Sequence, residues 1–146
     1  MTTASKLVAA LCMVFVAYWV TGIALPEIPE QYQPRGVGRV NILLGFYFGW
    51  TVMGKFISRG LNGAINATAT TSIILFVVAI FVHSFRLMIT HARRVWYDDA
   101  IEALADVFSL AIELTGEVLT TEFVISYLGG TFVAALITQF AARRWR

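Results

Sequence analysis

The stretch LVAALCMVFVAYWVTGIAL, which runs from Leu7 to Leu25, decides the fold class of this chain. Its 19 residues include no charged side chain. The hydrocarbon core of a bilayer is about 30 Å thick, so about 20 helical residues, each rising about 1.5 Å, are needed to cross it. Lipid offers no partners for backbone polar groups, so such a segment has to pair them within a helix. We therefore predict a transmembrane helix over residues 7–25, ended by Pro26.

A secretory signal peptide is the alternative for this segment. Lys6 precedes the apolar run, and Gly22-Ile23-Ala24 forms a weak cleavage site. The run is longer than the roughly 7–15 residues typical of the apolar region of a signal peptide. We therefore expect the segment to be retained as a helix.

Three further stretches have the length and composition of membrane-crossing helices. They cover residues 40–56, 64–85 and 119–140. The first of these three is rich in glycine and aromatic residues, and the second begins with small polar residues. Together the four stretches predict an all-α membrane protein with four transmembrane helices, folded as a single membrane domain over residues 1–146.

The composition indicates that the lipid bilayer is the main partner of this chain. Apolar residues make up 58% of the chain and charged residues 14%, against about a quarter in soluble domains. The mean hydropathy is +0.74. The net charge of +2 is too small to indicate a nucleic-acid partner. The one cysteine, Cys12, excludes an internal disulfide and a cysteine metal cluster.

The connections between these stretches differ in kind. Residues 26–39 contain three prolines and predict an irregular loop, whereas residues 58–63 predict a tight turn. The third connection, residues 86–118, is too long for a bare loop in so small a protein. We expect it to contain a helix over residues 99–115, with Asp99 as N-cap, Glu102 completing a capping box and Gly116 as the stop.

This additional helix is predicted to be amphipathic. One face carries apolar residues at helical spacing, and the opposite stripe is mostly acidic. The apolar face consists of Ile101, Leu104, Phe108, Ala111 and Ile112, and the stripe of Glu102, Asp106, Ser109, Glu113 and Glu117. Each acid would cost about 2.5–3.5 kcal/mol at the centre of a bilayer. We therefore predict an interfacial helix whose apolar face lies in lipid or on the bundle.

Both termini are predicted to lie in the cytoplasm. This orientation places six basic residues inside, Lys6, Lys55, Arg59, Arg143, Arg144 and Arg146, and five outside, Arg35, Arg39, Arg86, Arg93 and Arg94. The positive-inside rule decides little at six against five. The basic C-terminal tail without acids and the length of the third connection favour this orientation.

Small residues four apart predict two close helix contacts. The first pair is Gly45 and Gly49, and the longer ridge consists of Ser126, Gly130, Ala134, Thr138 and Ala142. Such residues let two helices approach closely, which matters in lipid because the hydrophobic drive between helices is missing. The contacts are expected within the bundle, and an interface with other membrane-protein subunits is the alternative.

His83, Arg86 and Glu122 are the candidates for a polar site. His83 and Arg86 lie one turn apart and could hold an anion or a metal, but anchoring at the membrane interface is the favoured interpretation. Glu122 lies about one turn into the last stretch, where an ionisable residue is a functional candidate that can still reach water. No catalytic residue, metal site or cofactor is predicted, because no phosphate loop, nucleophile elbow or zinc motif occurs and only His83 could be a haem ligand near membrane depth.

Four segments of the chain resemble a known family. They are Thr3-Ala4-Ser5-Lys6-Leu7-Val8-Ala9-Ala10, Gly49-Trp50-x-Val52-x-Gly54, Tyr97-Asp98 with Glu102-Ala103-Leu104, and Ala141-Ala142-Arg143-Arg144-Trp145. They are similar to segments of the TrgA family, small inner-membrane proteins of alphaproteobacteria associated with tellurite resistance. The resemblance covers the whole chain. It implies a bacterial inner-membrane protein linked to tellurite tolerance, and it carries over no catalytic or binding residue.

Three hypotheses for the function follow. The leading one is a non-enzymatic protein with a structural or accessory role in oxyanion or redox stress of the membrane. A thiol-based tellurite reductase would need an exposed, activated cysteine, and Cys12 lies in an apolar run. The first alternative is an accessory subunit of a respiratory or photosynthetic membrane complex, and the second is a small oxyanion transporter.

Overall fold

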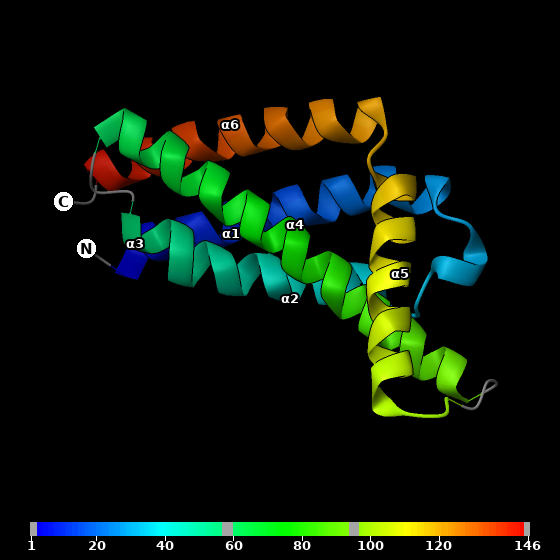
Figure 1. Ribbon diagram of the computed structural model, residues 1–146. Helices are drawn as coiled ribbons and strands as arrows, with labels where there is room; N and C mark the ends of the chain where they lie inside the picture. Colours follow the sequence, from blue (N-terminus) through cyan, green and yellow to red (C-terminus); the bar gives the residue numbers. More distant parts are fainter. Residues whose placement is uncertain (1–2, 57–59, 94–96, 145–146) are drawn as a thin grey trace.

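The chain folds into helices joined by short connections (Figure 1). The computed structural model describes residues 3–56, 60–93 and 97–144, and no strand occurs among them. The elements are α1 (Thr3–Ala24), η1 (Leu25–Glu27), η2 (Glu30–Tyr32), α2 (Val37–Phe48), η3 (Gly49–Met53), α3 (Gly54–Phe56), α4 (Gly60–Ala92), α5 (Ala100–Val118) and α6 (Thr121–Arg144). The all-α fold class is therefore confirmed. Ser58, Arg59, Arg94, Trp145 and Arg146, which the sequence analysis used, lie outside the described residues.

The long helices form a bundle with α5 lying across one end (Figure 1). The two chain termini lie together at the other end of the bundle. Three helical segments, Thr3–Glu27, Gly60–Ala92 and Thr121–Arg144, are long and apolar enough to cross a membrane. The structure thus supports three of the predicted spans by length and composition.

The remaining predicted span differs from a simple α-helix. Residues 37–56 are helical throughout, but the π-helical turn η3 separates α2 from α3. In this turn the Gly54 N–H donates to the Gly49 carbonyl, five residues back, as a π-turn requires. Residues 40–56, predicted as a membrane-crossing helix, are therefore helical but contain a π-turn in their middle. A π-turn has no strong signature in a single sequence.

Helix α4 extends beyond the predicted third span at both ends. The third stretch was expected over residues 64–85, but α4 has 33 residues and begins at Gly60, so residues 60–63 are helical rather than part of a turn. At about 1.5 Å per residue α4 is about 50 Å long, well beyond the roughly 30 Å of a hydrocarbon core. Its C-terminal part is packed against α5, which explains why the helix continues past the apolar run.

The connection after α1 is more ordered than a loop rich in proline suggests. It contains the two 3-10 turns η1 and η2, and α2 begins at Val37, inside the predicted loop. The Gln33 side chain donates from Nε2 to the carbonyl oxygens of Leu25, at 2.8 Å, and Ile28. These two hydrogen bonds fold the segment back over the end of the bundle.

The start of α5 is confirmed and its end is not. The Asp99 carboxylate accepts from the Glu102 N–H at 2.7 Å, and the Glu102 carboxylate accepts from the Asp98 N–H at 2.7 Å. The predicted stop at Gly116 is wrong, because α5 continues to Val118. Thr120 then starts α6 at once by accepting from the Phe123 N–H through its hydroxyl.

Helix α5 has three faces rather than the predicted two. Residues such as Leu110 and Leu114 are buried against the bundle, mainly on α4. Most of the predicted apolar face points outward, with Ile101 and Ile112 about three-quarters exposed at 76% and 75%. The acids lie on a third side. Of the predicted apolar face only Ala111 is buried, and the other buried residues of α5, Val107, Leu110, Leu114 and Val118, were not in that prediction.

The closest contact of the bundle joins α2 to α1. A Cβ atom built on Gly45 would lie 2.9 Å from the Met13 carbonyl oxygen, and one on Gly49 would lie 2.7 Å from the Ala10 Cα. Real Cβ atoms do not approach backbone atoms so closely, so the two glycines are required by this packing. This ridge is occupied by α1 of the same chain.

The ridge on α6 is also used inside the chain, where α6 packs on α1 and α4. Ala134 and Thr138 are buried, and Gly130 faces Val16. Across the contact with α4, the hydroxyls of Ser72 and Thr131 lie 3.0 Å apart and share a hydrogen bond.

We expect Gly49→Ala to destabilise the protein by about 1–3 kcal/mol, because the added methyl group would overlap the α1 backbone. Gly129→Ala is the matched control, since nothing lies within 4 Å of a Cβ at that helical position. Thermal unfolding of the purified protein in mild detergent measures both. Equal unfolding temperatures for the two variants would contradict the proposed contact.

Candidate functional site

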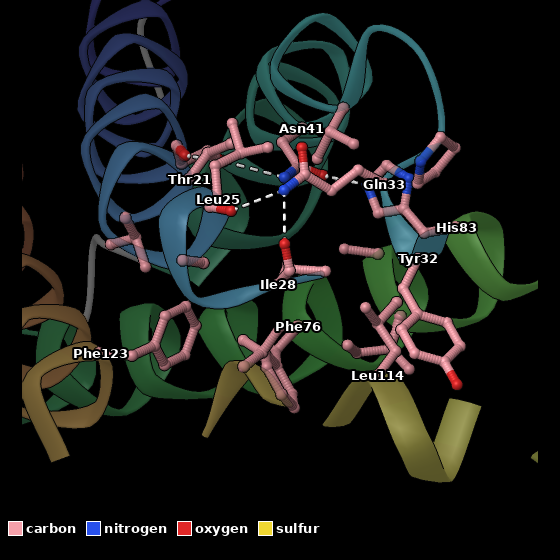
Figure 2. A pocket seen from close by; sticks show the side chains of 18 of the residues that line it. Thr21, Leu25, Ile28, Tyr32, Gln33, Asn41, Phe76, His83, Leu114 and Phe123 are labelled. Carbon is pink, nitrogen blue, oxygen red and sulfur yellow. Dashed lines mark hydrogen bonds between the residues drawn. The ribbon is translucent and has the colours of Figure 1, made fainter. Parts of the chain in front are cut away.

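A cavity of about 80 Å³ lies at the end of the bundle that is covered by the loop and α5. Figure 2 shows it between the end of α1 and the start of α2 on one side and α4, α5 and α6 on the other. The segment from Leu25 to Pro34 contributes part of the wall. The cavity therefore exists because the loop folds back over the helix ends.

A chain of hydrogen bonds borders this cavity. The His83 Nε2 lies 2.8 Å from the Asn41 Oδ1, and the Asn41 Nδ2 donates to the Thr21 hydroxyl at 2.9 Å. The Thr21 hydroxyl in turn donates to the Ala17 carbonyl at 2.6 Å. Three helices, α1, α2 and α4, are thus joined by side chains that are otherwise surrounded by apolar residues (Figure 2).

The donor-to-acceptor direction of these hydrogen bonds defines which ring nitrogen of His83 carries the proton. Because the Thr21 proton is used on Ala17, Thr21 can only accept from Asn41, so Asn41 turns its amide nitrogen to Thr21 and its oxygen to His83. The imidazole Nε2 then carries a proton, and in the neutral ring Nδ1 is a bare acceptor. Within the described part of the chain, Nδ1 is buried without a hydrogen-bond partner.

Two acid–tyrosine contacts lie outside the helical spans, and one of them joins the loop after α1 to α5. Hydrogen bonding to Glu113, and the charge of that carboxylate, raise the pKa of the Tyr32 hydroxyl above its ordinary value. Near the start of α5, the Tyr97 hydroxyl donates to Asp106 at 2.6 Å, which raises the pKa of Tyr97 to about 12. Part of the acidic stripe therefore has a structural use.

The three residues of the predicted polar site do not form one site. His83 lines the cavity, whereas Arg86 and Glu122 are not part of its wall. Arg86 donates to the Arg35 carbonyl and so holds the loop to α4. Glu122 is exposed in the first turn of α6. Of the small-residue ridges, Gly45, Gly49, Ala134 and Thr138 are buried in helix contacts.

Asn41, Thr21 and Gln33 are the residues of this site that sequence reasoning missed. Asn41 offered a signal, because it is a polar residue near the start of an apolar stretch, where a polar side chain in lipid has to find a partner. Thr21 bonds its own helix, as threonine does in any helix, and so gives no signal. Gln33 depends on the path of the loop, which the sequence does not specify.

Metal chemistry has no candidate cluster in the described ranges. No group of three or more His, Cys, Asp or Glu side chains there could hold a metal ion. His91 and Asp106 come within 3.6 Å of each other near the start of α5, which makes a pair rather than a metal site.

Comparison with known proteins gives no further guide. No protein-family model, curated protein or solved structure matches this chain.

We expect Asn41→Ala to cost about 1–3 kcal/mol of stability, because it leaves the buried Nε2 proton of His83 without an acceptor. Asn66→Ala, on the exposed face of α4, is the matched control and should change stability by less than about 0.5 kcal/mol. Unfolding in detergent compares the two. An unaffected Asn41→Ala protein would show that the hydrogen-bond chain does not hold the three helices.

Proposed function

We propose that this chain is a non-enzymatic integral protein of the bacterial inner membrane, with four spans and both termini in the cytoplasm, that supports tolerance to tellurite and related oxyanion stress. The spans are α1, the continuous path α2–η3–α3, α4 and α6. Helix α5 lies across the end of the bundle, on the surface of the inner membrane that faces away from the cytoplasm.

The exposed apolar residues support a bilayer location. Large apolar side chains point outward along α1 and α6, among them Phe15 and Trp19 on α1 and Leu128 and Phe132 on α6. A water-soluble protein rarely exposes so large a continuous apolar surface. No Asp, Glu, Lys or Arg among the described residues is buried in the bundle. The exposed apolar surface along the long helices is the single observation that carries the membrane part of the proposal.

The length of the α2–η3–α3 path supports a fourth span. Its 20 residues, from Val37 to Phe56, would extend about 30 Å, which equals the thickness of a hydrocarbon core. The path lies along α1, which is itself long and apolar enough to cross. Two helices of matching length in contact would be expected to cross the same lipid layer.

The distribution of charge supports the orientation. The end of the bundle that holds both termini carries Lys6, Lys55, Arg143 and Arg144 without a carboxylate, and the opposite end carries Arg35, Arg39, Arg86 and Arg93. All nine carboxylates of the chain belong to segments at the opposite end, with the loop, α5 and the start of α6. The basic tail without acids, rather than the number of basic residues at each end, therefore favours the cytoplasm for the termini.

Single cysteines in a Cys12→Ala background test this topology. We expect a membrane-impermeant maleimide to label Gln31→Cys in cells with an opened outer membrane, and to label Thr3→Cys and Arg144→Cys only after the inner membrane is permeabilised. All three positions are exposed in the fold. Labelling of Thr3→Cys and Arg144→Cys from opposite sides would mean three spans and would reject the four-span arrangement.

The role in tellurite tolerance is supported by the resemblance to the TrgA family, and the position of Cys12 favours an indirect role. Cys12 is partly buried on α1 and belongs to an apolar segment. Reduction of an oxyanion by a thiol needs an accessible thiolate. An effect on the membrane or on its redox proteins demands no thiol chemistry from this chain.

Deletion of the gene is expected to lower the tellurite concentration that stops growth several-fold. The wild-type chain and Cys12→Ala should both restore tolerance, and Gly49→Leu, which disrupts the α1–α2 contact, should not. Growth on graded tellurite, with expression checked in membranes, measures this. Unchanged tolerance after deletion rejects the proposed role, and failure of Cys12→Ala alone would point to thiol chemistry.

An accessory subunit of a membrane complex is the second candidate. The observation in its favour is the outward apolar face of α5, including Leu104 and Phe108, next to α4. Such an interface would have to use this or another outer face, because Gly45 and Gly49 are occupied by α1. A small oxyanion transporter is less well supported, since Arg86 holds the loop and the buried bundle residues carry no cation in the described ranges.

A further inference from the structure

The wall of the cavity at the loop end of the bundle is mostly apolar. Its largest contributors are apolar side chains from four helices: Val20, Leu75, Phe76, Ile80, Leu114 and Phe123. All except Phe76 are buried, so the packing of the surrounding helices holds them in place. The walls that an occupant would touch are therefore mostly hydrocarbon.

The polar side chains around the cavity are already paired with protein atoms. Thr21, Asn41 and the Nε2 of His83 bond one another, and Gln33 bonds two loop carbonyls. The Tyr127 hydroxyl donates to the Ser72 carbonyl at 2.7 Å. The bare Nδ1 of His83 has less than 1 Å² of accessible surface, so it offers no acceptor to the cavity.

This chemistry excludes a polar occupant. A buried water needs roughly two to four polar partners, and apolar cavities stay dry. An engineered cavity of about 150 Å³ with such walls takes up benzene or xenon. At about 80 Å³ this cavity is roughly half that size, so it suits a xenon atom or the last few carbons of a chain.

We propose that this cavity is a binding site for an uncharged hydrocarbon group. The group is either the end of an acyl chain from a surrounding lipid or a small apolar solute. The Gln33 hydrogen bonds hold the loop segment in place, so that Leu25 and Ile28 form part of the cavity wall. This site does not depend on the role in tellurite tolerance, because its walls and its size define what it accepts.

Methyl NMR of the protein in lipid nanodiscs tests the site directly, with xenon as the solute. We expect the Ile28 and Ile80 methyl signals, which line the cavity, to shift with xenon pressure along a saturating curve. Met13, which is fully buried but lies outside the cavity, should not shift, and Ile73, which faces outward, should shift only in proportion to pressure.

The same sample separates the two sources of hydrocarbon. Magnetisation transfer from lipid chain protons to Ile28 and Ile80 identifies an acyl chain as the occupant, whereas saturable xenon binding without such transfer identifies a site for free apolar solutes. The absence of both would overturn the proposal.

Filling the cavity provides the second test. Ala24→Leu and Ala79→Leu project from opposite walls and should abolish the saturable response, and Ala69→Leu, on the exposed face of α4, should leave it unchanged. Two fillers are used so that poor folding of one does not decide the result. A saturable response that survives in both folded fillers would place the bound xenon elsewhere and would overturn the proposal. Wild-type tellurite tolerance in a filler that no longer binds xenon would separate this site from the proposed function.

Discussion

The close approach of α1 and α2 is the interaction on which the rest of the bundle depends. In lipid, two helices gain nothing from hiding apolar surface, so their association relies on contact between backbones and on hydrogen bonds. Gly45 and Gly49 provide that contact against Met13 and Ala10. Helix α6 packs on another face of α1, so α1 is the shared neighbour that holds the bundle together.

The hydrogen bonds among Thr21, Asn41 and His83 and the cavity lie together at one end of the bundle. Near the loop, Asn41 on α2 donates to Thr21 on α1, and His83 bonds Asn41 from α4. These side chains bond one another, and the unpaired Nδ1 of His83 has almost no accessible surface, so the cavity wall is mostly apolar. The hydrogen-bonded side chains and the apolar side chains therefore line the same cavity at this end of the bundle.

The parts of the fold that depend on local chemistry could be predicted from the sequence. The apolar stretches, the cap at Asp99 and the close contact at Gly45 and Gly49 follow from hydropathy, capping and side-chain size. The inner face of α5 and the extension of α4 could not be predicted, because both depend on packing between those two helices. Of the site, only His83 was singled out, since the path of the loop determines which residues meet it.

The π-turn at η3 has a consequence for how α2 follows its neighbour. Gly45, Gly49 and Gly54 all abut α1, although the last step in sequence is five residues rather than four. In an unbroken α-helix, with 3.6 residues per turn, a five-residue step would rotate Gly54 away from α1. The π-turn accommodates the extra residue, so Gly54 still faces α1, where it lies beside Lys6. An apparent irregularity in the helix is thus what keeps the two backbones in register to the end of the pair.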